Sequence, residues 1–161
     1  MAVAVVLAAV VSVLVSALVS GGGGPAQASR ARQYVAFTSC LLTDDRGLSS
    51  PQAATVWAGM EQASGKTRAK VEYVPVMSGP GEGAAAPVLA GLALGHCSVV
   101  IAVGSGEVAA VRAEARRFGS VRFVVVDAPA RGTNVSAVRG SATVVKSGIA
   151  ALVEQAVAAS G

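Results

Sequence analysis

The stretch that decides the fold is residues 97–139, which read CSVVIAVGSGEVAAVRAEARRFGSVRFVVVDAPARGTNVSAVR. A short apolar run at 98–103 ends in the glycine turn 104–106, and a helical pattern follows it. A second apolar run, 121–126, stops at Asp127. Continuous β-branched runs that alternate with helices are typical of parallel strands covered on both faces. The stretch therefore predicts an α/β fold, and ligands are expected beyond the carboxyl ends of its strands.

The rest of the chain supplies the other elements of such a fold. Ser50 followed by Pro51 is a typical helix start, and Pro75 indicates an edge strand or the end of a strand. Further strands are expected over 34–42, 71–76 and 135–139, and further helices from 51 to the closing Gly65, over 85–94 and over 143–159. Right-handed crossovers then favour a three-layer α/β/α sandwich with a five-stranded parallel sheet in the order 2-1-3-4-5, a flavodoxin-like lobe.

Residues 1–28 are expected to be a signal peptide and not part of the folded domain. Residues 2–19 carry no charged side chain, and Ala26-Gln27-Ala28 places small residues where signal peptidase cleaves. Cleavage there would leave 29–161 as a single secreted lobe. Because no Lys or Arg precedes the apolar run, a retained membrane anchor is the alternative, and a cytoplasmic chain is the remaining one.

The charge of the chain is mildly basic, +4 at pH 7. The basic residues are scattered. No aromatic residues interleave with the two small groups that they form, which are Arg112, Arg116 and Arg117 on one predicted helix and Lys66, Arg68 and Lys70 before a predicted strand. Nucleic-acid-binding domains instead gather basic residues on one face and carry recognisable motifs, so we expect no nucleic-acid partner. A chain of 161 residues has room for one domain with a modest core.

Five motifs follow one another along the chain: CLLTDDRG (40–47), SPQAATVWAGM (50–60), HCSVVIAVGSGEVAAV (96–111), VRFVVVDA (121–128) and NVSAV (134–138). In this order and spacing they resemble the basic membrane protein family of extracytoplasmic solute-binding proteins. The resemblance covers roughly 37–150 and implies one lobe of a type I periplasmic-binding-protein fold. It also implies a small polar solute and an ABC importer as partners.

The resemblance further implies a solute cleft at the carboxyl edge of the sheet. In the family, the loop after the first strand and the glycine loop after the third strand help line that cleft. By position the ligand-binding candidates are Asp44, Asp45, Arg46, Ser49, Ser50, Gly104, Ser105, Gly106 and Asp127. The helix start after the glycine loop suits an anion or a carbonyl ligand, although Glu107 in the first turn satisfies the same dipole.

Two features depart from the family pattern. Ser50-Pro51-Gln52 replaces the family's Ser-Phe-Asn, so the aromatic that contacts a base is absent, which argues against a purine nucleoside. Family members also have two lobes, and this sequence matches one, so the chain is either a short relative or a truncated receptor. The alternative function is a cell-envelope module that keeps the lobe as a scaffold and binds a protein partner.

The sequence shows no pattern of a catalytic, cofactor or metal site. Ser105 lies in Val-Gly-Ser-Gly-Glu, which lacks the spacing of a nucleophile elbow, and Gly79, Gly81 and Gly83 lack the dinucleotide fingerprint. The single histidine, His96, is not part of a His, Cys and carboxylate set with metal-ligand spacing. We therefore expect a non-catalytic protein with no cofactor and no metal.

The two cysteines, Cys40 and Cys97, are expected to form a disulfide in an exported domain. The first and third strands are neighbours in the predicted order, but aligning their ends leaves an offset of about three residues, or ~10 Å. Bridged Cα atoms lie within ~7 Å of each other, so a bridge requires a staggered sheet or a bend at His96. The alternative is two separately buried thiols.

Overall fold

A five-stranded sheet lies at the centre of the part of the chain that the structure describes. In the computed structural model, which describes residues 33–77 and 83–161, the strands are β1 (Thr38–Thr43), β2 (Lys70–Pro75), β3 (Val99–Ala102), β4 (Arg122–Val126) and β5 (Val135–Val138). Their order is β2-β1-β3-β4-β5, and every neighbouring pair is parallel. The predicted fold class and strand order are therefore confirmed.

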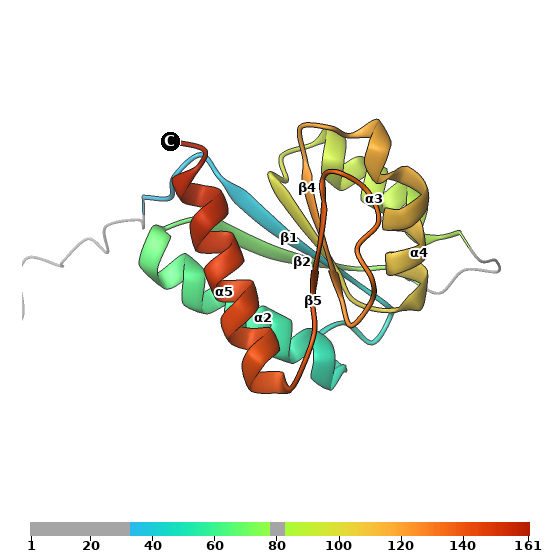
Figure 1. Cartoon of the computed structure of the whole chain (residues 1–161), viewed down its shortest axis with the longest axis horizontal. Helices are drawn as coiled ribbons and strands as arrows, with labels where there is room; N and C mark the ends of the chain where they lie inside the picture. The colour runs from blue at the N-terminus through green and yellow to red at the C-terminus, as the bar shows by residue number, and fades with distance from the viewer. Residues whose placement is uncertain (1–32, 78–82) are drawn as a thin grey trace, which may run out of the picture. The chain divides into compact units, whose positions relative to one another are not determined.

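Helices cover both faces of this sheet, as the continuous apolar runs predict. The helices are α2 (Pro51–Thr67), α3 (Ala85–Leu94), α4 (Ser105–Glu114) and α5 (Ala142–Ala158), with short 3-10 helices η1 (Gly47–Ser49) and η2 (Ala115–Arg117). Figure 1 shows α2 and α5 together on one face and α3 and α4 on the other. The result is a three-layer sandwich with one apolar core on each side of the sheet.

The alternation of side chains along the central strands divides these two cores. In β1, Leu41 packs in the core beneath α2 and α5, whereas Cys40 and Leu42 pack in the core beneath α3 and α4. The same alternation separates Ile101 from Val100 in β3. Since both faces are covered, every residue of β1 and β3 is buried. Successive side chains of a strand point to opposite faces, so each strand contributes to both cores.

Several element ends differ from the predicted ones. The first strand begins at Thr38 and not at residue 34, because the chain turns there: the Phe37 N–H donates to the Val35 carbonyl at 2.8 Å. Helix α2 passes through Gly65 and ends at Thr67, followed by Arg68 in the left-handed region (φ 62°). Edge strand β2 ends at Pro75, in agreement with the prediction for that proline.

The two long helices on one face approach each other at a glycine. A Cβ atom added to Gly59 of α2 would lie 2.5 Å from the carbonyl oxygen of Lys146 in α5, and 3.2 Å from the Cβ of Ile149. Gly65, in the same helix, has open space where its Cβ would be. Gly59 therefore sets the close packing of α2 on α5.

The predicted leader, residues 1–28, lies outside the described residues. Among the helices of 33–77 and 83–161, none combines the length and the apolar character needed to cross a bilayer.

Candidate functional site

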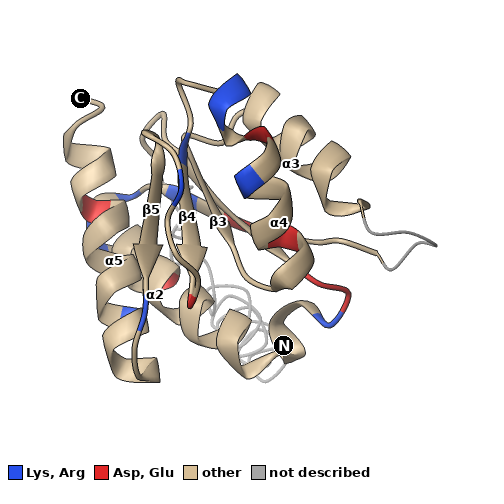
Figure 2. Ribbon diagram, turned by 45° about the vertical axis from the view of Figure 1, so that its right-hand side comes forward, with Lys and Arg blue, Asp and Glu red and all other residues tan. Residues whose placement is uncertain are grey.

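A cavity of about 700 Å³ opens at the carboxyl end of the sheet, beside the loops that follow β1 and β3. Its polar lining comes from Asp44, Asp45, Ser105 and Glu107, and its apolar lining includes Met77, Ala85 and Ala110. Figure 2 shows acidic segments in the loop after β1 and at the start of α4, on the same side of the sheet. This is the edge at which ligands of open α/β sheets are expected.

The loop after β1 is held by a local ion pair. Arg46 donates from Nη2 and Nε to Asp44 Oδ2 at 2.7 and 3.0 Å, and its backbone N–H donates to Asp44 Oδ1 at 3.2 Å. The Arg46 side chain is 67% exposed and does not line the cavity. Arg46 therefore orients the Asp44 carboxylate from outside the cavity, whereas Asp44 and Asp45 line the cavity.

The turn after β3 brings a buried carboxylate to the cavity. Gly104 has φ +116°, a conformation that residues with a Cβ rarely adopt, and a Cβ there would collide with the Glu107 carboxylate. Glu107, in the first turn of α4, is only 5% exposed and packs over this glycine. The glycine that the sequence marks as a turn is thus also required for the carboxylate to fold back over the turn.

Three carboxylates and no basic side chain line the cavity, and Arg46 pairs with one of them, Asp44, from outside the lining. Burial raises the pKa of Glu107 above its ordinary 4.5, and the charges of Asp44 and Asp45 raise it further. The hydrogen bond from its own backbone N–H acts in the opposite direction. Because Glu107 occupies the helix start itself, and two aspartates stand beside it, the site favours a cationic or hydrogen-bond-donating group over an anion.

The structure divides the sequence-predicted candidates into two groups. The candidates that line the cavity are Asp44, Asp45, Ser105 and Gly106. Gly104 is not in the lining but packs against the carboxylate of Glu107, which is. The candidates that do not line it are Arg46, Ser49, Ser50 and Asp127.

Asp127, which has φ +55°, instead accepts a hydrogen bond from Gln52 Nε2 at 2.6 Å and so connects the end of β4 to the start of α2. Ser50 is the N-cap of α2, as predicted, although its side chain makes no capping hydrogen bond.

Sequence analysis missed Glu107 and the apolar lining as site residues. From the sequence, Glu107 is expected only to balance the helix dipole. Its position in the first turn of the helix after the third strand is the one signal that places it near the cavity. Met77 follows β2 and Ala85 begins α3, and neither residue type indicates a ligand-binding role. Their role is visible only once the order of the strands places the end of β2 beside the loop after β1.

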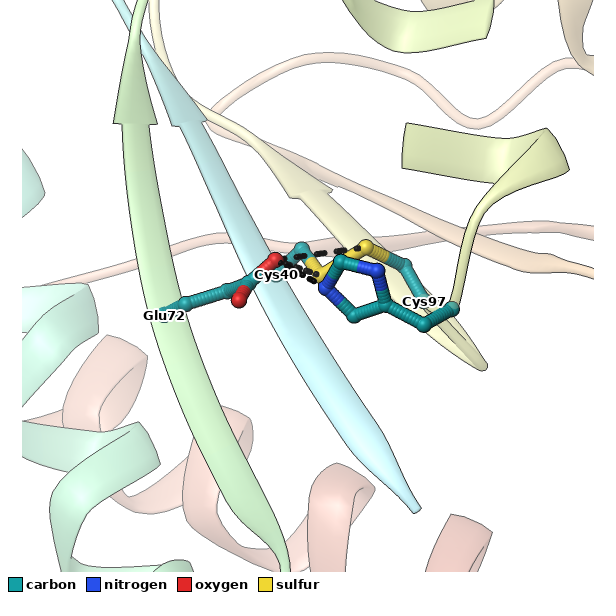
Figure 3. The surroundings of a disulfide bond; sticks show 4 residues. Cys40, Glu72 and Cys97 are labelled. Carbon is teal, nitrogen blue, oxygen red and sulfur yellow. Dashed lines mark hydrogen bonds and ion pairs between the residues drawn. A yellow bond between two sulfur atoms is a disulfide. The ribbon is translucent and has the colours of Figure 1, made fainter. Parts of the chain in front are cut away.

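Cys40 and Cys97 form a disulfide, with their Cα atoms 5.9 Å apart. The predicted register offset is present, because Cys40 aligns with Val100, three residues beyond Cys97. The chain bends between the end of α3 at Leu94 and the start of β3, and the Cys97 N–H donates to the Leu92 carbonyl at 3.3 Å. This bend brings Cys97 to the face of β1 where Cys40 lies (Figure 3).

No family model and no curated protein sequence matches the chain. Among solved structures, it is similar to a fragment of a "putative lipoprotein" from Peptoclostridium difficile 630, with 16% identity and a TM-score of 0.63 over 74% of this chain and 98% of that one. It is also similar to ABC transporter system solute-binding proteins from Aeropyrum pernix K1, with 18% identity and a TM-score of 0.52. A third similar structure is a transcriptional activator of the comK gene from Bacillus halodurans, with 16% identity and a TM-score of 0.50.

These likenesses concern the fold. The match covers 63% of this chain and 28% of the Aeropyrum protein, and 62% of this chain and 33% of the Bacillus protein. The chain therefore spans about a third or less of these two proteins, whereas it spans nearly all of the Peptoclostridium fragment. The described domain has a fold similar to that of solute-binding proteins.

Proposed function

We propose that this chain is a non-catalytic, extracytoplasmic solute-binding lobe related to the basic membrane protein family. The observation that carries the proposal is the cavity at the carboxyl edge of the sheet, which is lined by Asp44, Asp45 and Glu107 together with apolar residues. The fold similarity to a solute-binding protein and to a lipoprotein fragment supports a location outside the cytoplasm and a role beside an ABC importer.

The lining of the cavity defines the class of solute. A protonated amine is attracted by the carboxylates of Asp45 and Glu107, and hydroxyl groups can donate to the same oxygens. Met77 and Ala110 offer apolar surface to a short hydrocarbon body. A small solute that carries an amine on an apolar body fits this lining, whereas a dicarboxylate or a phosphate meets like charge.

The arrangement of the possible catalytic groups supports a binding role. Ser105 follows β3 and His96 precedes it, so the chain's single histidine and the serine of the cavity lie at opposite ends of that strand. The His96 ring is paired with Glu72 at 2.7 Å. A serine nucleophile needs its base within hydrogen-bond reach, and this pair does not provide it.

Isothermal titration calorimetry of the purified chain tests the proposal. The ligands are an alkyl amine, a nucleoside and, as the anionic comparison, a dicarboxylate, each at up to about millimolar concentration, where binding of ~4 kcal/mol is still detected. We expect the amine to bind and the dicarboxylate not to bind. If neither the amine nor the nucleoside produces a heat of binding, the proposal is overturned. If only the dicarboxylate binds, the assigned solute class is refuted.

Variants locate the site. Asp45→Asn and Glu107→Gln are each expected to weaken amine binding about tenfold or more, because each removes a charge-assisted hydrogen bond. Glu114→Gln is the matched control, since Glu114 is also an α4 carboxylate but pairs with Arg117 and does not line the cavity. Equal effects of all three substitutions would mean that the amine responds to net charge and not to this cavity.

A further inference from the structure

Four side chains with metal-ligating atoms meet near the start of β3, whereas the proposed solute cavity lies beside the loops that follow β1 and β3. Cys40, Glu72, His96 and Cys97 place one ligand atom each within 4.8 Å of one another. Glu72 Oε1 lies 3.2 Å from Cys40 Sγ, 3.8 Å from Cys97 Sγ and 2.7 Å from His96 Nε2. Figure 3 shows Glu72 on β2 directed at the sulfur of Cys40 on the neighbouring strand β1.

The fold assembles this cluster from three separate segments. The parallel register of β1 and β2 places Cys40 opposite Glu72, and the bend before β3 supplies His96 and Cys97. Sequence spacing does not reveal the set, because Glu72 is 24 positions from His96 and 32 from Cys40. The pairing of β1 with β2 and the bend before β3 together make these residues neighbours.

The oxidation state of the sulfurs decides what this cluster can bind. In the disulfide the sulfurs carry no proton and no thiolate charge, and only the Glu72 carboxylate and the His96 imidazole remain as ligands. After reduction the same place offers two thiolates, one imidazole and one carboxylate. Thiolate and imidazole together select Zn²⁺ and similar borderline ions, whereas Mg²⁺ and Ca²⁺ require oxygen ligands.

The spacing of the ligand atoms fits a tetrahedral ion once the sulfurs separate. Bonds of about 2.3 Å to sulfur and about 2.0–2.2 Å to nitrogen and oxygen place neighbouring ligand atoms about 3.3–3.8 Å apart. The two contacts of Glu72 with sulfur, 3.2 and 3.8 Å, are already near that range. The ion would replace the 2.7 Å hydrogen bond between Glu72 and His96.

The cluster also combines a buried and an accessible side. Cys40 is fully buried and Cys97 is 4% exposed, so thiolates there are protected from solvent on the core side. The side chains of His96 and Glu72 are 62% and 38% exposed. An ion can therefore enter from solvent past the imidazole and the carboxylate and meet the sulfurs behind them.

The geometry points to a redox-controlled Zn²⁺ site made of Cys40, Cys97, His96 and Glu72, independent of solute binding. A dithiol reductant gives two electrons and two protons to the disulfide, which becomes two thiols while the reductant closes to its own disulfide. Zn²⁺ then binds and displaces the two thiol protons. Oxidation by another disulfide compound removes two electrons from the two thiolates, re-forms the Cys40–Cys97 bond and releases the ion.

Titration with Co²⁺, a spectroscopic stand-in for Zn²⁺, tests the site on the full chain. We expect the chain reduced by a phosphine to bind one Co²⁺ with thiolate-to-metal charge-transfer and tetrahedral d–d bands, which equimolar Zn²⁺ removes. The oxidised chain is expected to show neither band and to bind at least about 100-fold more weakly. A reduced, folded chain without these bands would overturn the inference.

Variants decide whether all four residues ligate. His96→Ala and Glu72→Gln are each expected to weaken binding to the reduced chain by about tenfold or more. Glu61→Gln, an exposed carboxylate on α2, is the matched control. Bands that survive unchanged in both His96→Ala and Glu72→Gln would show thiol chelation without the site and would refute the proposal.

Circular dichroism covers the case in which reduction unfolds the chain. In that case Zn²⁺ is expected to restore the folded spectrum of the reduced wild-type chain but not of His96→Ala, because binding only to the folded state stabilises it. Failure of Zn²⁺ to restore the wild-type spectrum would overturn the inference as directly as missing cobalt bands.

Discussion

Gly59 allows α2 to pack against the backbone of α5, so replacing it with alanine is expected to force the two helices apart. The added Cβ would lie 2.5 Å from the Lys146 carbonyl oxygen, and real Cβ atoms keep at least 3.0 Å from such an atom. The helices must therefore move by about half an ångström or distort locally. Gly65→Ala in the same helix is the matched control, since nothing lies within 4 Å of its added Cβ.

The two substitutions are expected to change stability in opposite directions. Alanine in place of glycine within a helix stabilises by about 0.8–1.0 kcal/mol, so Gly65→Ala should raise the free energy of unfolding by that amount. Overpacking a close contact costs about 1–3 kcal/mol, so in Gly59→Ala the same gain is cancelled or exceeded. The Gly59→Ala variant should therefore be about 1–3 kcal/mol less stable than the Gly65→Ala variant.

Urea unfolding measures this difference. The midpoint should move to higher urea for Gly65→Ala and stay or move to lower urea for Gly59→Ala, with similar slopes for both. If Gly59→Ala stabilised the protein as much as Gly65→Ala, the inference that Gly59 is needed for the close packing of α2 on α5 would be wrong. The double variant should equal the sum of the single ones, because Gly65 does not touch α5.

Three further predictions concern the disulfide and the cavity. Replacing both Cys40 and Cys97 by serine is expected to lower the free energy of unfolding by about 4 kcal/mol, which is the chain-entropy estimate for their separation of 57 positions. Urea unfolding measures this loss, and a loss below about 1 kcal/mol would contradict the estimate. Because the folded-state pKa of Glu107 is raised, the folded protein keeps a proton above pH 4.5 that the unfolded chain loses, so wild-type stability should fall as pH rises through that window. Glu107→Gln should therefore gain stability relative to the wild type from below pH 4.5 to neutral pH, and a constant difference in urea midpoint would contradict this. Gly104→Ala should destabilise by about 1–3 kcal/mol through strain at φ +116° and should also abolish amine binding in calorimetry, because the new Cβ displaces the Glu107 carboxylate; full binding would refute that link.

The fold was predictable because its signals are local and repeated. The apolar runs that became β3 and β4 are continuous, and each is separated from the next element by a glycine or acidic turn. Right-handed crossovers then leave few possible strand orders. The ends were less predictable, because residues 34–37 have strand-like composition but turn on themselves, and Gly65 lies inside α2 and not at its end.

The candidate site was only partly predictable, because the sequence does not show in which direction a loop side chain points. The loops after β1 and β3 lie at one sheet edge, as the predicted strand order implies, and Asp44, Asp45 and Ser105 line one cavity there. Asp127 ends a strand at the same edge but turns toward Gln52 on α2. A residue type and its position in the chain do not reveal which side of the sheet a loop side chain faces.

The ligand-atom cluster around the disulfide was beyond sequence analysis for a different reason. His96 and Cys97 are adjacent, but the carboxylate that completes the set comes from an edge strand whose register with β1 is fixed only by the folded sheet. Motif searches depend on short spacings between ligand residues, and Glu72 lies far from both cysteines in the sequence.

The packing of α2 on α5 also bears on the order of events during synthesis. Residues near the start of the domain are covered by a helix that is made about 90 positions later, and Met60 and Val56 share their core with Ile149 and Val153. A ribosome-bound chain without α5 therefore has only α2 to cover that face of its sheet. Because contacts this distant in sequence are slow to form, the core beneath α2 and α5 is expected to be completed only after α5 has been synthesised.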